Sequence, residues 1–466
     1  MFSPAPHIIR DGAMSQSEHS IPFVSGAKTA AQGGHFEEFS QHPAYFLTRA
    51  HAECGELAEF DMGGTRTVLM VGPEAHEAVF REDDIKVSAR EAYQFMVPIF
   101  GQGIQYGAPL DIERQQLRMH SRGLASEKMN HYAPIIAKEA RDWIAEWGES
   151  GEFDFYEGFA DLTIKTSTHC LLGAEFRYSL TDEFASLYHT LGAAADAGGL
   201  QDPGARKGAY DARDKARARL EELITERVER RRLAGEVHPD LLQVYMDATY
   251  ADGSQLSTSE IAGMIVWFMF AGHHTSANTA AWVLVELARY PELAKTVVEE
   301  VDAVIATGNQ FDMKVLRRMS ALEGFIRETL RVHPPLNTLT RRVVEPFEYK
   351  GHIIDKGKNV MLCPYVAHRL ESSFENALEF QPDRPAPDNP FALIPFGGGQ
   401  RKCVGNAFAI LQVKVIFSVL LSEYEFELAG PPGEYAEIMP SLILRPSDPC
   451  VLRYRRRAPG KSTQVQ

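Results

Sequence analysis

One cysteine stands in a glycine-rich segment directly before an apolar helical pattern, and this arrangement constrains the chain more than any other feature. The segment is Phe396-Gly-Gly-Gly-Gln-Arg-Lys-Cys403, and the apolar stretch covers 406–421. A cysteine at a helix N-terminus is favoured as a thiolate, because free N–H groups and the helix dipole stabilise negative charge. Glycines let the backbone take positive φ angles and approach a flat ligand closely. Cys403 is therefore a candidate metal ligand at the start of a helix.

Three interpretations of this segment are open from its residues alone. The first is a glycine-rich turn with a structural cysteine. The second is a phosphate-binding loop, although the usual Gly-Lys-Ser/Thr ending is missing. The third is a single sulfur ligand to a haem iron, which is the arrangement that favours cleavage of the O–O bond.

Length and charge limit the class of protein. The chain has 466 residues, of which 44% are hydrophobic, and no linker interrupts its middle. We therefore expect one large domain at 34–457, between a flexible N-terminal tail (1–33) and a C-terminal tail (458–466). The net charge of −15 argues against a nucleic-acid binder.

Cysteine spacing and the N-terminal sequence predict a cytoplasmic protein. The five cysteines are widely spaced and fit neither a disulfide framework nor a zinc site, which is typical of a reducing compartment. Residues 1–33 hold no apolar run long enough for a signal peptide or a membrane anchor, and Met14 is an alternative start.

The residue pattern predicts a mainly α protein with a smaller β portion. Alternating residues around Gly63-Gly64 indicate a β-hairpin over 57–72, and turn signals indicate a strand-rich patch over 338–364. The spacing Ser257-x-x-Glu260 is a capping box, so a helix should begin there. The stretches expected to be helical are 132–147, 205–233 and 260–290.

The helix expected after Ser257 becomes polar in its middle, over 271–276. An almost wholly apolar helix is buried, so polar residues inside it need partners or a cavity. We expect the hydroxyl of Thr275 to bond back to a carbonyl and open a local bulge, which would place a proton donor beside a cavity. The alternative is a helix-packing patch with satisfied polar groups. His273 and His274 are adjacent and point about 100° apart, which excludes an i, i+4 metal pair.

Taken together, three motifs resemble the cytochrome P-450 family. Residues 396–405 match Phe-x-x-Gly-x-Arg-x-Cys-x-Gly, and 271–275 resemble the signature Ala/Gly-Gly-x-x-Thr of its long central helix. The resemblance implies the cytochrome P-450 fold in a single large domain, a haem b cofactor whose iron Cys403 binds, and dioxygen as co-substrate. The third motif consists of Glu328, Arg331 and Arg384, which the resemblance makes a buried network behind the haem loop; a surface ion pair is the alternative.

The same resemblance assigns roles to further residues. It implies that Thr275, together with His274, relays protons during catalysis. The residues expected to bind haem are Tyr93, Tyr106, Arg114, His120, Arg341, Phe396, Arg401, Cys403 and Gly405. The residues expected to line the substrate cavity are Tyr93, Phe95, Met96, Phe100, Phe270, Ala271 and Leu336. A solvated charge is the alternative for each cation, and core packing is the alternative for the aromatic residues.

Several segments resemble the sterol 14α-demethylase branch in particular. The loop 93–103 is similar to its substrate-contact loop, Gly103-Ile-Gln-Tyr106 to its Gly-Val-x-Tyr element, and a histidine precedes Thr275. This implies a 14α-methyl sterol or a polycyclic terpenoid as substrate, with the methyl group lost as formate after three oxidations. Two departures concern the substrate and the haem loop: Asn337 and Thr338 stand in a usually apolar strand, and 400–402 read Gln-Arg-Lys instead of Arg-His-Arg.

The chain needs a separate electron donor, because it has neither a flavin domain nor a cysteine set for an iron–sulfur cluster. We expect a ferredoxin and its reductase to pass electrons from NAD(P)H, docking on a basic patch of Arg401, Lys402 and Lys414. We also expect azole inhibitors to bind and the protein to be a monomer. The alternatives are a hydroxylase of an unrelated lipid, a peroxide-driven oxidase of the same fold, and a non-catalytic haem sensor or ligand carrier. Thr275 argues against the peroxide-driven oxidase, which needs no proton relay.

Overall fold

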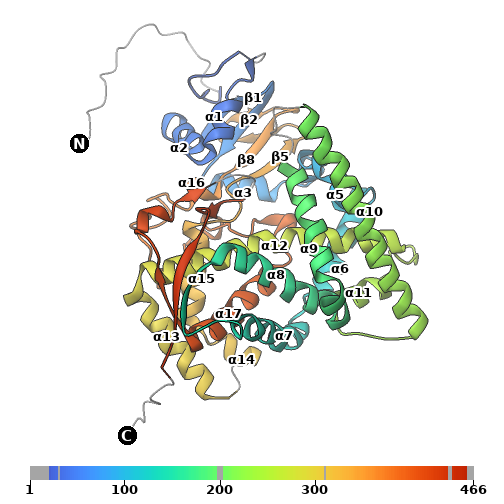
Figure 1. Cartoon of the computed structure of the whole chain (residues 1–466). Helices are drawn as coiled ribbons and strands as arrows, with labels where there is room; N and C mark the ends of the chain where they lie inside the picture. Colours follow the sequence, from blue (N-terminus) through green and yellow to red (C-terminus); the bar gives the residue numbers. More distant parts are fainter. Residues whose placement is uncertain (1–19, 30–31, 197–202, 309–310, 439–442, 459–466) are drawn as a thin grey trace.

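Helices form most of the molecule, and a sheet that contains β1, β2, β5 and β8 lies at one edge (Figure 1). The computed structural model describes residues 20–29, 32–196, 203–308, 311–438 and 443–458. The helices are α1 (Phe36–Gln41), α2 (Pro43–Cys54), α3 (Pro73–Arg81), α4 (Ala89–Ala92), α5 (Val97–Phe100), α6 (Leu110–Gly123), α7 (Ser126–Ile144), α8 (Phe155–Leu172), α9 (Ala174–Asp196), α10 (Pro203–Ala234), α11 (Leu241–Asp247), α12 (Thr258–Arg289), α13 (Pro291–Ala306), α14 (Met313–Leu316), α15 (Ser320–Val332), α16 (Pro364–Ala367) and α17 (Asn406–Glu423). The strands are β1 (Leu57–Met62), β2 (Thr65–Met70), β3 (Val87–Ser88), β4 (Ser150–Asp154), β5 (Leu339–Val343), β6 (Phe347–Tyr349), β7 (His352–Ile354), β8 (Asn359–Leu362), β9 (Tyr424–Leu428), β10 (Glu437–Ile438), β11 (Arg445–Pro446) and β12 (Val451–Arg456).

The predicted hairpin is confirmed and belongs to a five-stranded sheet. Strands β1 and β2 pair antiparallel from Leu57↔Met70 to Met62↔Thr65. Gly63 and Gly64 both have positive φ, the conformation that a two-residue hairpin turn requires. The strand order β1-β2-β8-β5-β3 joins this hairpin to the second predicted β region.

The second β region, predicted over 338–364, is also confirmed. It contains β5, β6, β7 and β8. Strand β8 pairs parallel with β2 and antiparallel with β5, so two segments almost 300 residues apart share one sheet. This sheet carries β5 to the edge of the helical body (Figure 1).

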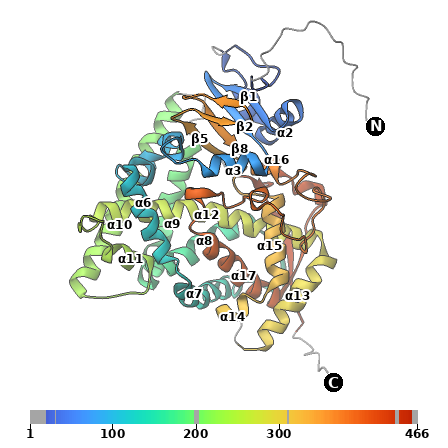
Figure 2. The same cartoon turned by 180° about the vertical axis from the view of Figure 1, so that it is seen from behind.

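Helix α12 crosses the middle of the molecule in both views (Figures 1 and 2). It begins at the predicted capping box: the Glu260 N–H donates to Ser257 Oγ at 3.2 Å, and the Ser257 N–H donates to Glu260 Oε2 at 2.8 Å. The apolar segments of α12 before and after its polar middle are buried. A buried central helix is what its composition predicts.

Helix α17 follows the cysteine segment and is buried from Leu411 to Leu421. Within the described ranges it is the one helix long and apolar enough to cross a membrane, and 67% of it is buried inside the protein. Such burial is what a core helix shows.

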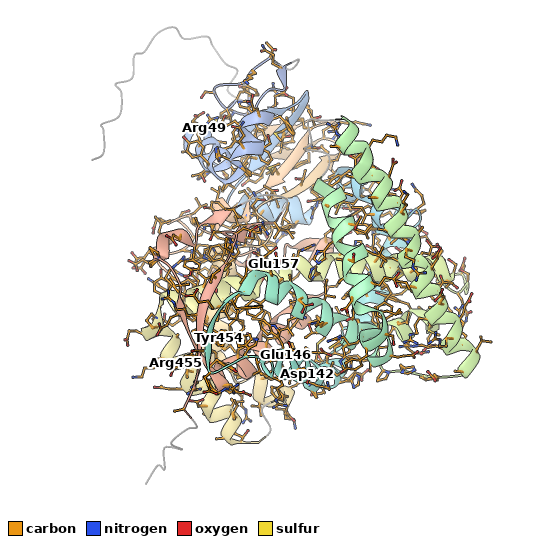
Figure 3. All side chains as sticks on the ribbon, in the orientation of Figure 1. Arg49, Asp142, Glu146, Glu157, Tyr454 and Arg455 are labelled. Atoms are coloured by element: carbon orange, nitrogen blue, oxygen red, sulfur yellow. The ribbon has the colours of Figure 1, made fainter. Side chains whose placement is uncertain are left out.

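Charged side chains such as Asp142, Glu146 and Glu157 lie at the outer surface (Figure 3).

The N-terminal boundary of the fold differs from the predicted one. Residues 20–29, expected in a flexible tail, pack on β1: the Val24 N–H donates to Glu59 O at 2.8 Å, and Val24 is fully buried. The apolar run Ile21-Pro-Phe-Val24 is short and lies between polar segments, so the sequence pattern did not predict a packed segment there. The remaining tail predictions, at 1–19 and 459–466, lie outside the described residues.

Candidate active site

The cysteine segment is held close against α3 by its glycines. Gly399 has a φ of +63°, and a Cβ there would lie 2.3 Å from the carbonyl oxygen of Phe80. A Cβ on Gly398 would lie 2.6 Å from the Phe80 ring. Only glycine allows this approach without displacing neighbours. The Cys403 N–H donates to Phe396 O at 2.9 Å and closes the loop.

Cys403 lies just before the N-terminus of α17 and keeps an exposed side chain. Burial by surrounding protein raises the pKa of its thiol, and the N–H groups of Gly405 and Asn406 oppose this by favouring the thiolate. The sulfur is thus enclosed by protein yet open to a ligand. A metal ion would shift the balance to the thiolate, because the thiolate is the ligating form.

The middle of α12 borders open space. Ala271 is exposed and Thr275 is half-buried, although the helix on either side of them is buried. A Cβ on Gly272 would meet no atom within 4 Å. The Thr275 hydroxyl donates to Ala271 O at 2.9 Å, as predicted, but the helix is continuous and the predicted bulge does not form. This intrahelical bond is accommodated without a break in the backbone ladder.

A pair of tyrosines lies beside β5, which carries a buried arginine. The rings of Tyr93 and Tyr106 stack with centroids 5.4 Å apart, and the Thr340 N–H donates to Tyr93 Oη at 3.2 Å. Burial raises the pKa of Tyr106 to about 12, while Arg401 and Arg341 act in the opposite direction. Both guanidinium groups therefore lie near the Tyr106 hydroxyl.

Arg341 is a buried cation without an acidic partner among the described residues. It is 8% exposed, and its Nη1 donates to the carbonyl of Thr340 at 2.9 Å. Because a buried charge is costly unless it is paired, this site calls for an anionic ligand. A haem group carries two carboxylates, so Arg341, the open face of α12 and the accessible thiol of Cys403 together fit haem.

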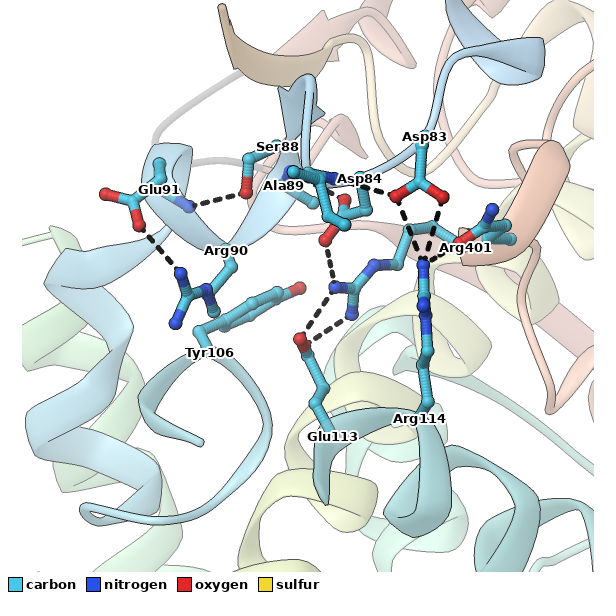
Figure 4. A network of polar contacts seen from close by, with 12 residues as sticks. Asp83, Asp84, Ser88, Ala89, Arg90, Glu91, Tyr106, Glu113, Arg114 and Arg401 are labelled. Atoms are coloured by element: carbon cyan, nitrogen blue, oxygen red, sulfur yellow. Dashed lines mark hydrogen bonds and ion pairs between the residues drawn. The ribbon is translucent and has the colours of Figure 1, made fainter. Parts of the chain in front are cut away.

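Two other predicted haem-binding arginines already bind carboxylates (Figure 4). Arg401 pairs with the Glu113 carboxylate, with 2.7 Å between Nη2 and Oε2, and with Asp84 Oδ2 at 2.5 Å. Arg114 Nη2 donates to Asp83 Oδ1 and to Gln400 Oε1, both at 3.1 Å. The sequence did not indicate Asp84 or Glu113 as parts of the site, because Glu113 is an ordinary acid in the first turn of α6 and Asp84 lies in a turn before β3.

His120 lies in a buried polar network. Its Nε2 contacts Gln105 Nε2 at 3.0 Å, its Nδ1 bonds the Tyr245 hydroxyl, and its ring stacks on Trp267 at 4.5 Å. Burial lowers the pKa of His120 to about 3, so the ring is neutral. Neither ring nitrogen is free for a haem carboxylate.

The predicted cavity residues form an aromatic cluster between the loop 93–103 and α12. The Phe100 and Phe270 rings lie 5.5 Å apart, and the Tyr93 and Phe95 rings 5.9 Å apart. Met96 and Phe100 are buried, whereas Phe95 is 50% exposed. The structure therefore brings residues of the loop to α12 but leaves Phe95 at the rim.

Leu336 enters from a third segment. It forms an isolated β-bridge with Ile443 and is half-buried. Its neighbours differ: Asn337 is buried and already has an interaction partner, and Thr338 is half-buried. Both residues lie just before β5, which begins at Leu339, and of the two Thr338 is the one with an accessible side chain.

Two histidines of α12 face α8 and α9. His273 Nδ1 contacts Thr163 Oγ1 at 3.2 Å, and its Nε2 has no partner among the described residues. The His274 ring lies 6.3 Å from that of His189, a residue that the sequence did not single out. Burial, with smaller contributions from His189 and Arg445, lowers the pKa of His274 to about 4, so it is neutral near pH 7.

Glu328, Arg331 and Arg384 are brought together and are all buried. Arg331 donates to both Glu328 oxygens, at 2.9 and 2.7 Å, and Arg384 Nε donates to Glu328 Oε1 at 3.2 Å. His368 links this cluster to the cysteine segment, because its Nδ1 contacts Arg331 O at 3.1 Å and its Nε2 accepts the Ile394 N–H at 2.9 Å. Removing one member would strand a buried charge.

The predicted basic docking patch is wrong. Lys414 is 3% exposed, and its Nζ donates to Leu316 O at 3.0 Å and to Glu323 Oε2. Arg401 is largely buried and paired with two carboxylates. Of these three residues only Lys402 is exposed. Lys414 is buried because α17 is a core helix, and its long side chain reaches the carboxylate of Glu323 on α15.

Comparisons with known proteins agree with this geometry. The cytochrome P450 family model matches residues 30–452. The chain is 40% identical over 448 residues to the sterol 14α-demethylase of Mycolicibacterium vanbaalenii, covering 94% of this chain and 98% of the relative. It is 34% identical over 436 residues to the lanosterol 14-alpha demethylase of Homo sapiens, covering 91% and 85%.

Solved structures share the fold. The retinoic acid-bound cyanobacterial CYP120A1 superimposes with a TM-score of 0.81 at 19% identity, covering 94% of this chain and all of that one. The haem domain of cytochrome P450DA gives a TM-score of 0.82 at 22% identity, covering 94% and 98%. The predicted fold class is therefore confirmed.

Proposed function

The chain belongs to the cytochrome P450 family, and we propose that this monooxygenase oxidises a 14α-methyl sterol or a similar polycyclic terpenoid. Near-full-length identity of 40% to a sterol 14α-demethylase supports this substrate class. The aromatic cluster that joins the loop 93–103 to the open face of α12 supports it as well, since a large rigid apolar ligand needs such a wall.

We propose Cys403 as the axial ligand of the haem iron. Its accessible thiol and the two backbone N–H groups directed at the sulfur support this role. When bound, haem with a thiolate ligand supplies the activation of dioxygen. Phe396 and Gly405 lie on either side of this ligand. The carbonyl of Phe396 accepts the Cys403 N–H, and a Cβ on Gly405 would lie 3.8 Å from the Cys403 sulfur.

Arg341 with the hydroxyls of Tyr93 and Tyr106 would hold the haem carboxylates. The single observation that carries this assignment is the buried Arg341 guanidinium with no acidic partner in the described part of the chain. Arg401 lies near the same Tyr106 hydroxyl, but Glu113 and Asp84 already match its charge, so it would not supply an uncompensated charge to the haem carboxylates. We leave Arg114 and His120 out of this set, because their polar atoms are bound elsewhere.

Thr275 would hold and pass a proton at its Oγ1. The hydroxyl donates to Ala271 O, its oxygen can accept from a water in the open space, and rotation of the hydroxyl would let it donate to that water. His274, the preceding residue, has a pKa of about 4 and is neutral near pH 7, so it would orient that water by hydrogen bonding and not take up its proton. A demethylase would use this relay in each of its three oxidations.

Electrons would come from NAD(P)H through a separate donor, most simply a ferredoxin with its reductase. Lys402 alone cannot steer that donor, so the docking surface must include residues outside the predicted patch. Five cysteines, all unpaired, support a cytoplasmic location. The monomeric state stays a proposal from the sequence. Azole compounds should bind the iron, because this needs only an open apolar channel beside it.

Titration of the ferric protein with a sterol panel tests the substrate class. A 14α-methyl sterol should displace water from the iron and shift the Soret band to the high-spin position. Unrelated fatty acids of similar size serve as the control. A shift with fatty acids and none with any sterol or polycyclic terpenoid would contradict the proposed substrate class.

A further inference from the structure

The Arg401 guanidinium lies between two buried carboxylates. Glu113 is fully buried and binds it through both oxygens, and Asp84, at 6% exposure, binds its Nη2 (Figure 4). Burial raises the pKa of Glu113, and the bonds from Arg401 oppose this by favouring the carboxylate. With both acids ionised, two negative charges meet one positive charge, which leaves a local excess of one negative charge. Arg401 stands two residues before Cys403 in the chain.

Neighbouring cations do not cancel this excess by direct pairing. Arg341 lies near the same Tyr106 hydroxyl, but it donates to Thr340 O and is the group proposed to hold the haem carboxylates. Arg90 is near enough to favour ionised Glu113, but its Nη2 donates to Glu91 at 3.1 Å. Arg114 donates to Asp83, which is about half exposed. Tyr106 lies beside Arg401 and Glu113 (Figure 4), and its hydroxyl is neutral because its pKa is about 12.

We propose that Glu113, acting through Arg401, lowers the reduction potential of the haem iron. The proposal rests on the haem–thiolate site at Cys403. A buried negative charge favours the more positive oxidation state, and water screens it little there. Charges and hydrogen bonds around a metal's ligands tune its potential in the same way. Glu113 is therefore a positioning residue that fixes Arg401 and neutralises its charge. It sets the driving force for electron transfer from the donor.

Potentiometric titration of the haem-loaded full chain tests this directly. Glu113→Gln keeps the size of the side chain and removes its charge. The equilibrium constant for reduction should rise about tenfold, which is a positive shift of about 59 mV for a one-electron couple. Asp84→Asn should shift the potential in the same direction, and its amide oxygen can still accept the Ala89 N–H that Asp84 accepts at 3.0 Å.

Asp83→Asn is the matched control. It removes the same charge from the adjacent residue, but water screens Asp83, so the equilibrium constant should change by less than about twofold. Glu113→Asp retains the charge and should stay near the wild-type potential. If Glu113→Gln fails to load haem, Asp84→Asn carries the test.

The outcomes separate this inference from the proposed function. Haem-loaded Glu113→Gln and Asp84→Asn with potentials equal to that of Asp83→Asn would overturn it, even if melting temperature or haem retention falls. Wild-type protein that binds no haem through Cys403 would contradict the proposed function instead.

Discussion

The hydroxyl of Thr275 donates a 2.9 Å hydrogen bond to the carbonyl oxygen of Ala271, one turn earlier in α12. This bond positions the hydroxyl in the middle of α12, where the otherwise buried helix borders open space. The oxygen can accept from water there, and rotation of the hydroxyl would let it donate. The proposed proton relay depends on this position.

Thr275→Ala should keep haem and substrate binding but waste electrons as peroxide. Product formation should fall about 10²-fold, the lower range for loss of a positioned proton donor. The measurement compares electrons consumed with product formed. Thr275→Ser, which keeps the hydroxyl, should restore most of the coupling. Equal coupling in all three proteins would show that the hydroxyl has only a structural role.

Arg341→Ala should weaken haem retention. Loss of a charged hydrogen-bonding partner costs roughly 1.5–3 kcal/mol, so haem affinity should fall by one to two orders of magnitude. Haem transfer to an acceptor protein measures this. The neighbouring Arg342→Ala is the control, because successive strand residues point to opposite faces and Arg342 donates to Asn359 instead. Similar haem loss in both variants would argue against a specific contact.

Glu328→Ala should destabilise the protein by about 3–5 kcal/mol, because Arg331 and Arg384 would lose their buried carboxylate partner. Chemical denaturation of the apo and haem-loaded forms measures the change. Asp142→Ala breaks an exposed pair with Lys138 and should cost less than about 1 kcal/mol. Equal effects of the two substitutions would mean that the Glu328 cluster is no more than a surface bridge.

Acidification should destabilise the fold from about pH 6.5 downwards. Burial lowers the pKa of His120 to about 3 and that of His76 to about 4, below the unfolded value near 6.5. Between these values the unfolded chain binds protons that the folded one does not, so stability falls as the pH falls. Each histidine contributes a slope of about 1.4 kcal/mol per pH unit. Unfolding measured at pH 7 and pH 5 should give a smaller difference in His120→Gln; an unchanged difference would place its titration elsewhere.

Thr338→Ile should tighten the binding of a 14α-methyl sterol, because a half-buried hydroxyl two residues after Leu336 would be replaced by apolar surface. The dissociation constant from the high-spin shift measures this. Asn337→Ile is the contrasting variant: Asn337 is buried and already partnered, so its replacement should cost stability without improving binding. Weaker sterol binding in Thr338→Ile would indicate that the hydroxyl meets a polar group of the ligand.

Sequence predicted the features that short segments determine. The Gly63-Gly64 hairpin, the Ser257 capping box and the back-bonding of Thr275 each depend on residues within a few positions of one another. The contacts of Arg401 could not be predicted in this way, because Glu113 and Asp84 lie 288 and 317 residues away in the chain. Lys414 misled for a related reason: its charge suggested the surface, whereas a glutamate on α15 lets it stay buried.

The optical spectrum of the reduced carbon-monoxide complex tests the role of Cys403 most directly. Wild-type protein should show the strongly red-shifted Soret band of a thiolate-ligated haem, and Cys403→His should lose that band while retaining haem. Cys363→Ala removes a fully buried thiol outside the cysteine segment and should leave the band in place. The same red-shifted band in Cys403→His would contradict the assignment of Cys403 as the iron ligand.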